Sequence, residues 1–365
     1  MDQFVNNTTV ADHVMGAMPF MKHSPLVAAV FTAFYVVIFV LGVTGNLLVC
    51  VVVIKDRSMR TVTNYFIVNL AVSDLLVMLI CLPVTLVENL LTGWRFGQAM
   101  CKLYPVIQGA TVGASLFTLV AIAADRYKAV LHATSKKLSG CSTLCVVAVV
   151  WVLALAIMIP QGLVRRENWY YLTDGNNVVT CTEKWLNEIY RKLYFGSLFM
   201  ICYAIPLIVA IVLYVRIGYR IRKPRRSFHL SSSPQRARVS ARKVAVIKML
   251  ATVVVLFAVL WLPLQTVFMV LEFATITEAQ EYVIFVYVYP IAHWLTYLNS
   301  ALNPVVYGYF NNNFREAFHG LIATWRKNIG LDSMRKKAFI MSRRLTRTTK
   351  TPTSPTQQIQ LTTIN

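Results

Sequence analysis

The sequence predicts an all-α membrane protein, built as a bundle of seven transmembrane helices followed by a short amphipathic helix on the membrane surface. The 365-residue chain is 57% hydrophobic and only 14% charged, whereas soluble domains carry about 25% charged residues. The apolar residues gather in seven long blocks, and a helix of about 20 apolar residues spans a bilayer. The basic residues cluster between alternate blocks, which is typical of a chain that crosses a membrane repeatedly.

The seven apolar blocks define the predicted spans. Only helices satisfy the backbone hydrogen bonds of an open chain within lipid. The blocks run over Leu26–Ile54, Val62–Leu90, Gln98–Leu131, Cys141–Pro160, Lys192–Ile221, Val244–Leu271 and Tyr282–Tyr309. The predicted regions are therefore an N-terminal segment (1–25), the bundle (26–310), a surface helix (311–327) and a disordered tail (328–365).

The basic residues predict the orientation of the chain in the membrane. If the first connection lies inside, the inner segments hold 28 of the 36 lysines and arginines and 4 of the 15 acids. The positive-inside rule then places the N-terminus outside and the C-terminus in the cytoplasm of a multi-pass plasma-membrane protein. The net charge of +21 thus reflects topology and contact with anionic lipid, and we expect no binding to nucleic acid.

The outer segments carry two features that agree with this orientation. Asn6 and Asn7 each begin an acceptor sequence for N-glycosylation, a modification made on the outer side. Cys101 and Cys181 are the only cysteines in outer segments. A disulfide between them would hold the loop Glu167–Asn187 over the bundle, and two free thiols are the alternative.

The predicted cytoplasmic side has a loop, a helix and a tail. The loop Lys223–Arg238 is basic and rich in serine and proline, so we expect it to be flexible. Apolar residues recur at spacings of four, four and three over Asn312–Lys327, which predicts a helix with one face on the membrane. The tail ends in a cluster of threonines and a serine that are candidate phosphorylation sites, with plain disordered filler as the alternative.

Asp74 is the only charged residue deep within a predicted span, and such residues tend to be functional. Asn46, Ser115, Asn299 and Asn303 lie at depths that could face it. A carboxylate among neutral oxygens suits a small hard cation such as sodium, and a purely structural polar cluster is an equally open interpretation. We expect no cofactor apart from such an ion.

Three short motifs indicate a conformational switch. Asp125-Arg126-Tyr127 ends the third span, where Arg126 can pair with Asp125 or be freed for a partner. Trp261-Leu262-Pro263 and Asn303-Pro304-Val305-Val306-Tyr307 place prolines inside the sixth and seventh spans, where each proline kinks its helix. Two kinked helices in one bundle can adopt two arrangements of similar energy.

Together, these motifs resemble the signature of rhodopsin-like (class A) G-protein-coupled receptors. Asn46, Asp74, Trp151, Pro206 and the Cys101/Cys181 pair match too, so that together with the motifs each helix carries at least one landmark. The resemblance implies that an agonist shifts the population of two states, in which Phe257 and Trp261 repack and Tyr214 and Tyr307 move toward Arg126. It also implies a heterotrimeric G protein as partner, with arrestin and receptor kinases acting on the tail.

Shorter strings, including Pro83–Asn89 and Ser115–Ala123, resemble neuropeptide receptors of the RFamide type such as neuropeptide FF receptors. Receptors for neuropeptide Y, orexin and tachykinin are the alternatives. The resemblance implies that Glu272 receives the arginine of a ligand ending Arg-Phe-amide, because the planar guanidinium can make two parallel bonds to a carboxylate. The full set of predicted ligand residues is Thr85, Glu88, Gln108, Glu183, Gln265, Phe268, Glu272 and His293.

Other functions fit the sequence less well. Gln108 replaces the aspartate of amine receptors, and Tyr297 replaces the retinal-binding lysine of opsins. A transporter or channel would need several deep charges, and the chain has only Asp74. An enzyme is not expected, since metal-ligand and nucleophile motifs are missing from the sequence. The stretch Val239–Lys248 has no acid to hold Arg126, so we expect a measurable signal without ligand.

Overall fold

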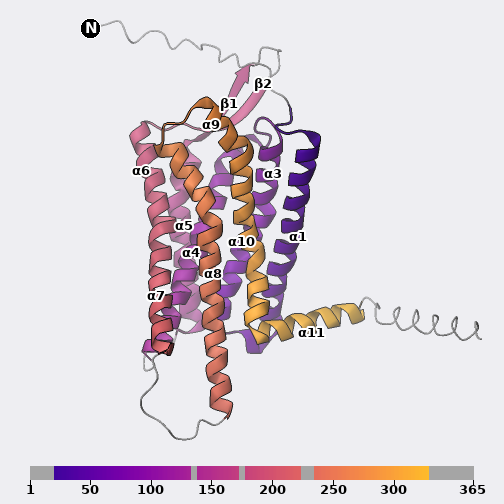
Figure 1. Ribbon diagram of the computed structural model, residues 1–365, viewed down its shortest axis with the longest axis vertical. Helices are drawn as coiled ribbons and strands as arrows, with labels where there is room; N and C mark the ends of the chain where they lie inside the picture. Colours follow the sequence, from indigo (N-terminus) through magenta and orange to yellow (C-terminus); the bar gives the residue numbers. More distant parts are fainter. Residues whose placement is uncertain (1–19, 133–137, 172–176, 223–233, 329–365) are drawn as a thin grey trace, which may run out of the picture. The chain divides into compact units, whose positions relative to one another are not determined.

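The computed structural model describes residues 20–132, 138–171, 177–222 and 234–328 (Figure 1). The chain divides into two units, Met1–Arg315 and Glu316–Asn365, and the first contains the helix bundle. The glycosylation acceptors Asn6 and Asn7 and the threonine-rich tail lie outside the described residues.

Seven helical segments form the bundle within the described residues, as predicted, and three of them contain a π-helical turn. They are α1 (Pro25–Lys55); α2 (Val62–Leu76), η2 (Val77–Cys81) and α3 (Leu82–Leu90); α4 (Gly97–Leu131); α5 (Gly140–Val164); α6 (Glu188–Phe199), η3 (Met200–Ala204) and α7 (Ile205–Arg222); α8 (Pro234–Phe273); and α9 (Glu278–Val283), η4 (Ile284–Val288) and α10 (Tyr289–Phe310). A 3-10 turn, η1 (Arg57–Met59), follows α1, and α11 (Asn312–Asn328) occupies the range predicted for the amphipathic helix.

Six of these segments, among the residues that the structure describes, are long and apolar enough to cross a membrane by length and composition. The seventh segment, which ends with α10, has a lower mean hydropathy than the other six because its buried face is polar. That face carries His293, Thr296, Asn299, Ser300 and Asn303. By contrast, α5 exposes Leu144, Val152 and Leu163, a surface that suits lipid.

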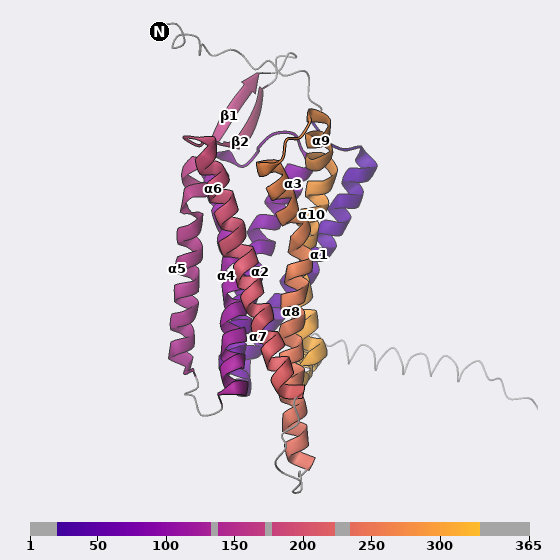
Figure 2. The same cartoon turned by 60° about the vertical axis from the view of Figure 1, so that its left-hand side comes forward.

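The predicted helical bundle is confirmed, and the loop before α6 adds a β-hairpin that the sequence did not indicate. Strand β1 (Arg165–Tyr171) pairs antiparallel with β2 (Asn177–Glu183), and Glu167 lies opposite Cys181. The two strands are rich in aromatic and β-branched residues, which favour extended structure. The hairpin lies at the end of the bundle where α6 begins (Figures 1 and 2). We call this the hairpin end, and we call the opposite end, where α4 finishes, the Arg126 end.

The helix α8 begins at Pro234 rather than at the predicted Val244, so it extends into the segment that we expected to be a flexible loop. Proline is well tolerated in the first turn of a helix, because its missing N–H would have no partner there. Outside the bilayer a helix needs no continuous apolar run, and for this reason hydropathy alone did not reveal the extension.

The helix α4 packs against α2, α5, α7 and the hairpin strand β1. A buried polar chain ties three of the helices together: Asn69 donates to Thr118 Oγ1 at 2.8 Å and accepts from Trp151 Nε1 at 2.9 Å. The helices α1 and α10 also approach closely, because a Cβ atom on Gly45 would lie only 2.9 Å from the Pro304 ring. These contacts position the predicted site residues inside the bundle.

Candidate functional site

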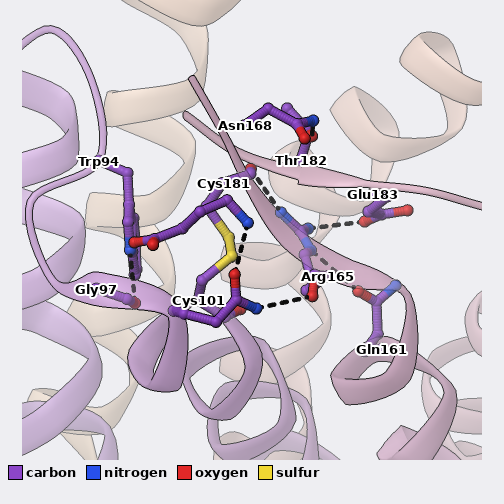
Figure 3. The surroundings of a disulfide bond; sticks show 11 residues. Trp94, Gly97, Cys101, Gln161, Arg165, Asn168, Cys181, Thr182 and Glu183 are labelled. Atoms are coloured by element: carbon purple, nitrogen blue, oxygen red, sulfur yellow. Dashed lines mark hydrogen bonds and ion pairs between the residues drawn. A yellow bond between two sulfur atoms is a disulfide. The ribbon is translucent and has the colours of Figure 1, made fainter. Parts of the chain in front are cut away.

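A disulfide joins Cys101 at the start of α4 to Cys181 in β2, which confirms the predicted pairing (Figure 3). Beside it, the Trp94 backbone N–H donates to Val179 O at 2.6 Å and the indole N–H donates to Gly97 O at 2.9 Å. Gly93 has a φ of +85°, a conformation that favours glycine. The hairpin is therefore fixed to the end of the bundle both covalently and by packing.

Both carboxylate oxygens of Glu183 are occupied within the hairpin end. Arg165 Nη2 lies 2.7 Å from Glu183 Oε1, and Trp185 Nε1 donates to Oε2 at 2.6 Å. Arg165 also donates to Gln161 Oε1 at 3.3 Å (Figure 3). Glu183 thus has a structural role that the sequence did not reveal, and a ligand would have to compete for it.

The predicted arginine acceptor Glu272 is also paired. Its Oε1 lies 3.0 Å from Nε of Arg191 on α6. The Glu272 side chain is 8% exposed and the Arg191 side chain is 39% exposed. The Arg191 guanidinium can therefore be reached from outside the bundle, while the carboxylate lies beneath it.

Glu88, near the end of α3, differs from the other two acids. It is half-buried, and among the described residues no ion pair or hydrogen bond is made to its carboxylate. Lys22 Nζ donates instead to the Glu88 backbone carbonyl at 2.7 Å. Of the three predicted acids, Glu88 is the one whose carboxylate keeps its acceptor positions open.

Thr85 and His293 converge on a set of tyrosines. Thr85 Oγ1 lies 2.6 Å from the Tyr104 hydroxyl and 2.5 Å from the Tyr297 hydroxyl. The His293 ring stacks on Tyr297 at 6.3 Å and meets Tyr289 at 4.2 Å between centroids. Neither Tyr104 nor Tyr289 was predicted from the sequence to belong to the site. Tyr104 lies one helical turn from Gln108, and that spacing could have indicated it.

The remaining predicted ligand residues are less closely linked. Phe268 contacts the Tyr289 ring at 6.2 Å, so it joins the group around His293. Gln108 and Gln265 are half-buried, and within the described part of the chain neither side-chain amide forms a hydrogen bond. Their amide groups remain available to a ligand.

Below this group, Phe257 and Trp261 stack on α8 with 5.4 Å between ring centroids and 15° between planes. Both side chains are buried, and the Trp261 indole N–H finds no hydrogen-bond partner among the residues that the structure describes. Pro263 lies inside α8 and Pro304 inside α10, so both helices continue through their prolines as predicted.

Among the described residues, Asn303 of the predicted cation set bonds the Asp74 carboxylate, and Ser300 bonds it as well. Asp74 is buried and accepts from Asn303 Nδ2 at 2.8 Å. The side-chain oxygens of Asn46, Asn299 and Asn303 are buried and have no hydrogen-bond partner in the described part of the chain. Ser115 is half-buried, and no interaction links its side chain to Asp74 in the described structure.

At the Arg126 end, Arg126 forms an ion pair with its neighbour Asp125, and its Nε lies 3.1 Å from Asp125 Oδ2. The hydroxyls of Tyr214 and Tyr307 are buried, and neither has a hydrogen-bond partner within the described ranges. The ring of Tyr127 contacts His132, with 6.0 Å between the ring centroids. The arrangement leaves two buried hydroxyl groups, either of which could accept a hydrogen bond from Arg126 after a rearrangement.

A seven-helix bundle, a disulfide between the third helix and a hairpin, and three switch motifs define a class of membrane receptor. The family model described as 7 transmembrane receptor (rhodopsin family) matches residues 45–307, and the chain belongs to this family. The general function of the family is G-protein signalling. The chain is therefore a receptor that crosses the membrane several times, and its family is one of receptors rather than of enzymes.

The relatives of the chain narrow the class. It is 43% identical to neuropeptide FF receptor 1 of Rattus norvegicus over 307 residues, which cover 81% of this chain and 71% of the relative. It is 43% identical to neuropeptide FF receptor 2 of Mus musculus over 81% of this chain and 73% of the relative. Neuropeptide Y receptor type 2 of Cavia porcellus is 34% identical over 84% of this chain and 78% of its own length. The resemblance to RFamide-type receptors is thereby confirmed.

Proposed function

We propose that this receptor binds an amidated neuropeptide ending Arg-Phe-amide at the hairpin end and passes the signal to a heterotrimeric G protein at the Arg126 end. The main support for the proposal is the sequence identity of the chain to its relatives. The identity is 43% to neuropeptide FF receptors and 34% to neuropeptide Y receptor type 2. The chemistry of the predicted ligand residues supports it, since they combine three acids with aromatic and amide side chains.

The predicted ligand residues divide by chemistry. A ligand arginine would bind the Glu272 carboxylate by replacing Arg191, because a guanidinium can form two parallel bonds with a carboxylate. The terminal amide would lie near Thr85, Gln108 and His293, whose side chains offer both donors and acceptors. The phenylalanine ring would descend toward Phe268 and Trp261.

Activation would then be a population shift, driven by the difference in the ligand's affinity for two bundle arrangements. Repacking of the stacked Phe257 and Trp261 would accompany an outward movement of α8 at the Arg126 end. The unpartnered hydroxyls of Tyr214 and Tyr307 could then approach Arg126. A cavity opened in this way would accept the G protein.

A sodium ion in the Asp74 cluster would favour the resting arrangement. Asp74, Asn299 and Asn303 supply a carboxylate and free amide oxygens, and Ser115 would complete the set. The test is a sodium titration of agonist affinity in wild type and in Asp74→Asn. Affinity that falls with sodium in wild type alone supports the ion, and affinity independent of sodium contradicts it.

The topology and remaining partners rest on the sequence. The charge distribution supports an extracellular N-terminus, glycosylated at Asn6 or Asn7, and a cytoplasmic C-terminus at the plasma membrane. The tail threonines would be phosphorylated by receptor kinases and bound by arrestin. The apolar face of α11 would contact membrane lipid.

The experiment that tests the ligand is a dose-response series with Arg-Phe-amide peptides on cells that express the receptor. We expect Glu272→Ala to weaken the response at least tenfold, or about 1.4 kcal/mol. Glu278→Ala is the matched control, because Glu278 is an exposed acid nearby in the chain. An unchanged curve for Glu272→Ala would remove that residue from the site, and no response of the wild type would reject the ligand class.

A further inference from the structure

Residues Phe20–Ser24, which we call the N-terminal strap, pair with the connection between α3 and α4. The Lys22 N–H donates to Leu90 O at 2.9 Å, and the Thr92 N–H donates to Phe20 O at 3.0 Å. Met21 lies opposite Leu91 in an antiparallel bridge. The strap is therefore held at the hairpin end by regular backbone hydrogen bonds.

Side chains fix the strap to two further elements. His23 is buried, 9% exposed, and its ring meets Phe31 of α1 edge-on at 5.0 Å and Tyr287 of η4 at 6.2 Å. The Arg95 guanidinium lies 5.1 Å from the centre of the Phe20 ring. Because these contacts involve residues on both sides of Lys22, they determine where the Lys22 side chain can reach.

The Lys22 ammonium is held beside the one predicted ligand acid whose carboxylate is unpaired. Its Nζ lies 2.7 Å from the backbone oxygen of Glu88. Lys22 exerts the largest attractive charge effect on the Glu88 carboxylate, and Arg165, which is bonded to Glu183, exerts the next. Glu88 lies three residues after Thr85 on α3, so both side chains share a helix face. Lys22 is thus placed where a ligand cation would enter.

We propose that Lys22 is a specificity-determining residue of the ligand entrance: the strap holds its positive charge next to Glu88 and weakens the binding of a ligand cation there. This inference rests on the proposed function, since it requires a cationic peptide that enters at the hairpin end. A ligand arginine that approaches Glu88 meets a carboxylate that already lies near a positive charge, so its attraction to that acid is weaker. A neutral ligand side chain meets no such competition.

The test compares two probes on the full-length receptor in membranes. One probe is an amidated peptide ending Arg-Phe-amide, and the other has citrulline, the neutral analogue of arginine, in place of the arginine. Lys22→Met keeps the length and apolar stem of the side chain and removes its charge. We expect it to tighten binding of the arginine probe about threefold, the size of a partly exposed charge effect, and to leave the citrulline probe unchanged.

Two controls assign the effect to Lys22 and Glu88. The gain should disappear in Glu88→Gln, and Lys184→Met, which removes an exposed lysine beside Glu183, should not reproduce it. Equal shifts for both probes, or a gain that survives Glu88→Gln, would overturn the proposal.

A failure of the proposed function has a different signature, in which neither probe binds the wild-type receptor. The Lys22–Glu88 coupling is then measured on the purified, ligand-free receptor through the Tm values of Lys22→Met, Glu88→Gln and the double variant. A double-variant shift that differs from the sum of the single shifts supports the coupling. Additive shifts would overturn it.

Discussion

The two ends of the bundle are held together in different ways. At the hairpin end, a disulfide and the ion pair Arg191–Glu272 join separate elements of the fold, and the N-terminal strap adds backbone hydrogen bonds. At the Arg126 end, the ion pair found among the described residues joins Arg126 to its own neighbour Asp125. Connections between elements therefore strengthen one end, whereas the charge pair at the other end links no two helices.

This difference matches the two tasks of a receptor. A ligand site must keep its side chains in position, because ordering them during binding would cost affinity. A switch needs two arrangements of similar energy, and an ion pair within one helix does not oppose the separation of neighbouring helices. The unpartnered hydroxyls of Tyr214 and Tyr307 fit the same interpretation, since a second arrangement could satisfy them.

The largest expected effect comes from removing the strongest connection at the hairpin end. Cys181→Ser breaks the disulfide, and loss of such a bond typically costs about 2–5 kcal/mol. We expect a lower Tm of the purified receptor and loss of most peptide binding, because the hairpin would no longer be fixed over α4. Cys202→Ser is the control, since Cys202 is a half-buried free thiol. Wild-type Tm and binding in Cys181→Ser would show that packing alone holds the hairpin.

The next effect concerns the weakly connected end. Asp125→Asn removes the described partner of the Arg126 guanidinium and leaves it free for Tyr214, Tyr307 or a G protein. We expect the ligand-free signal to rise about fivefold, equivalent to about 1 kcal/mol, at equal surface expression. Asp56→Asn serves as the control, because Asp56 is an exposed acid whose carboxylate accepts from its near neighbour Ser58. An unchanged ligand-free signal would mean that Asp125 does not restrain the switch.

The same contrast explains what the sequence could predict. The long apolar blocks predict the seven helical segments directly. The prolines within the sixth and seventh of these blocks predict two of the switch motifs. The partner of Glu272 was not predictable, because Arg191 lies 81 positions away and meets it only when α6 packs against α8. The hairpin was missed since its strands are short and depend on the disulfide and on Trp94 for their position. Thr85 and His293 were predicted, but the tyrosines that join them follow from packing.

A smaller effect is expected at the ion pair between Arg191 and Glu272. Arg191→Ala leaves the buried Glu272 carboxylate without its partner, which destabilises the free receptor. An arginine-containing peptide would restore the pair, so we expect it to bind about threefold more tightly while the Tm of the unliganded receptor falls. Lys192→Ala controls for charge, because Lys192 is exposed on the same helix. Weaker peptide binding in Arg191→Ala would mean that Arg191 itself contacts the ligand.

The smallest expected effect concerns the stability of the backbone hydrogen bonds that hold the N-terminal strap at the hairpin end. Burial lowers the pKa of His23, the Lys22 charge lowers it further, and the backbone of Asn89 opposes this. Binding of the strap to the bundle therefore favours the neutral His23 ring. The strap is fully stable above the ordinary histidine pKa of about 6.5, and its stability declines as the pH falls below that value. We expect hydrogen exchange at Lys22, corrected for intrinsic rates, to lose protection between about pH 7.5 and about pH 5.5. His23→Phe keeps the ring contacts and cannot titrate, so it should show no such loss, and equal pH dependence in the two proteins would exclude His23 as the cause.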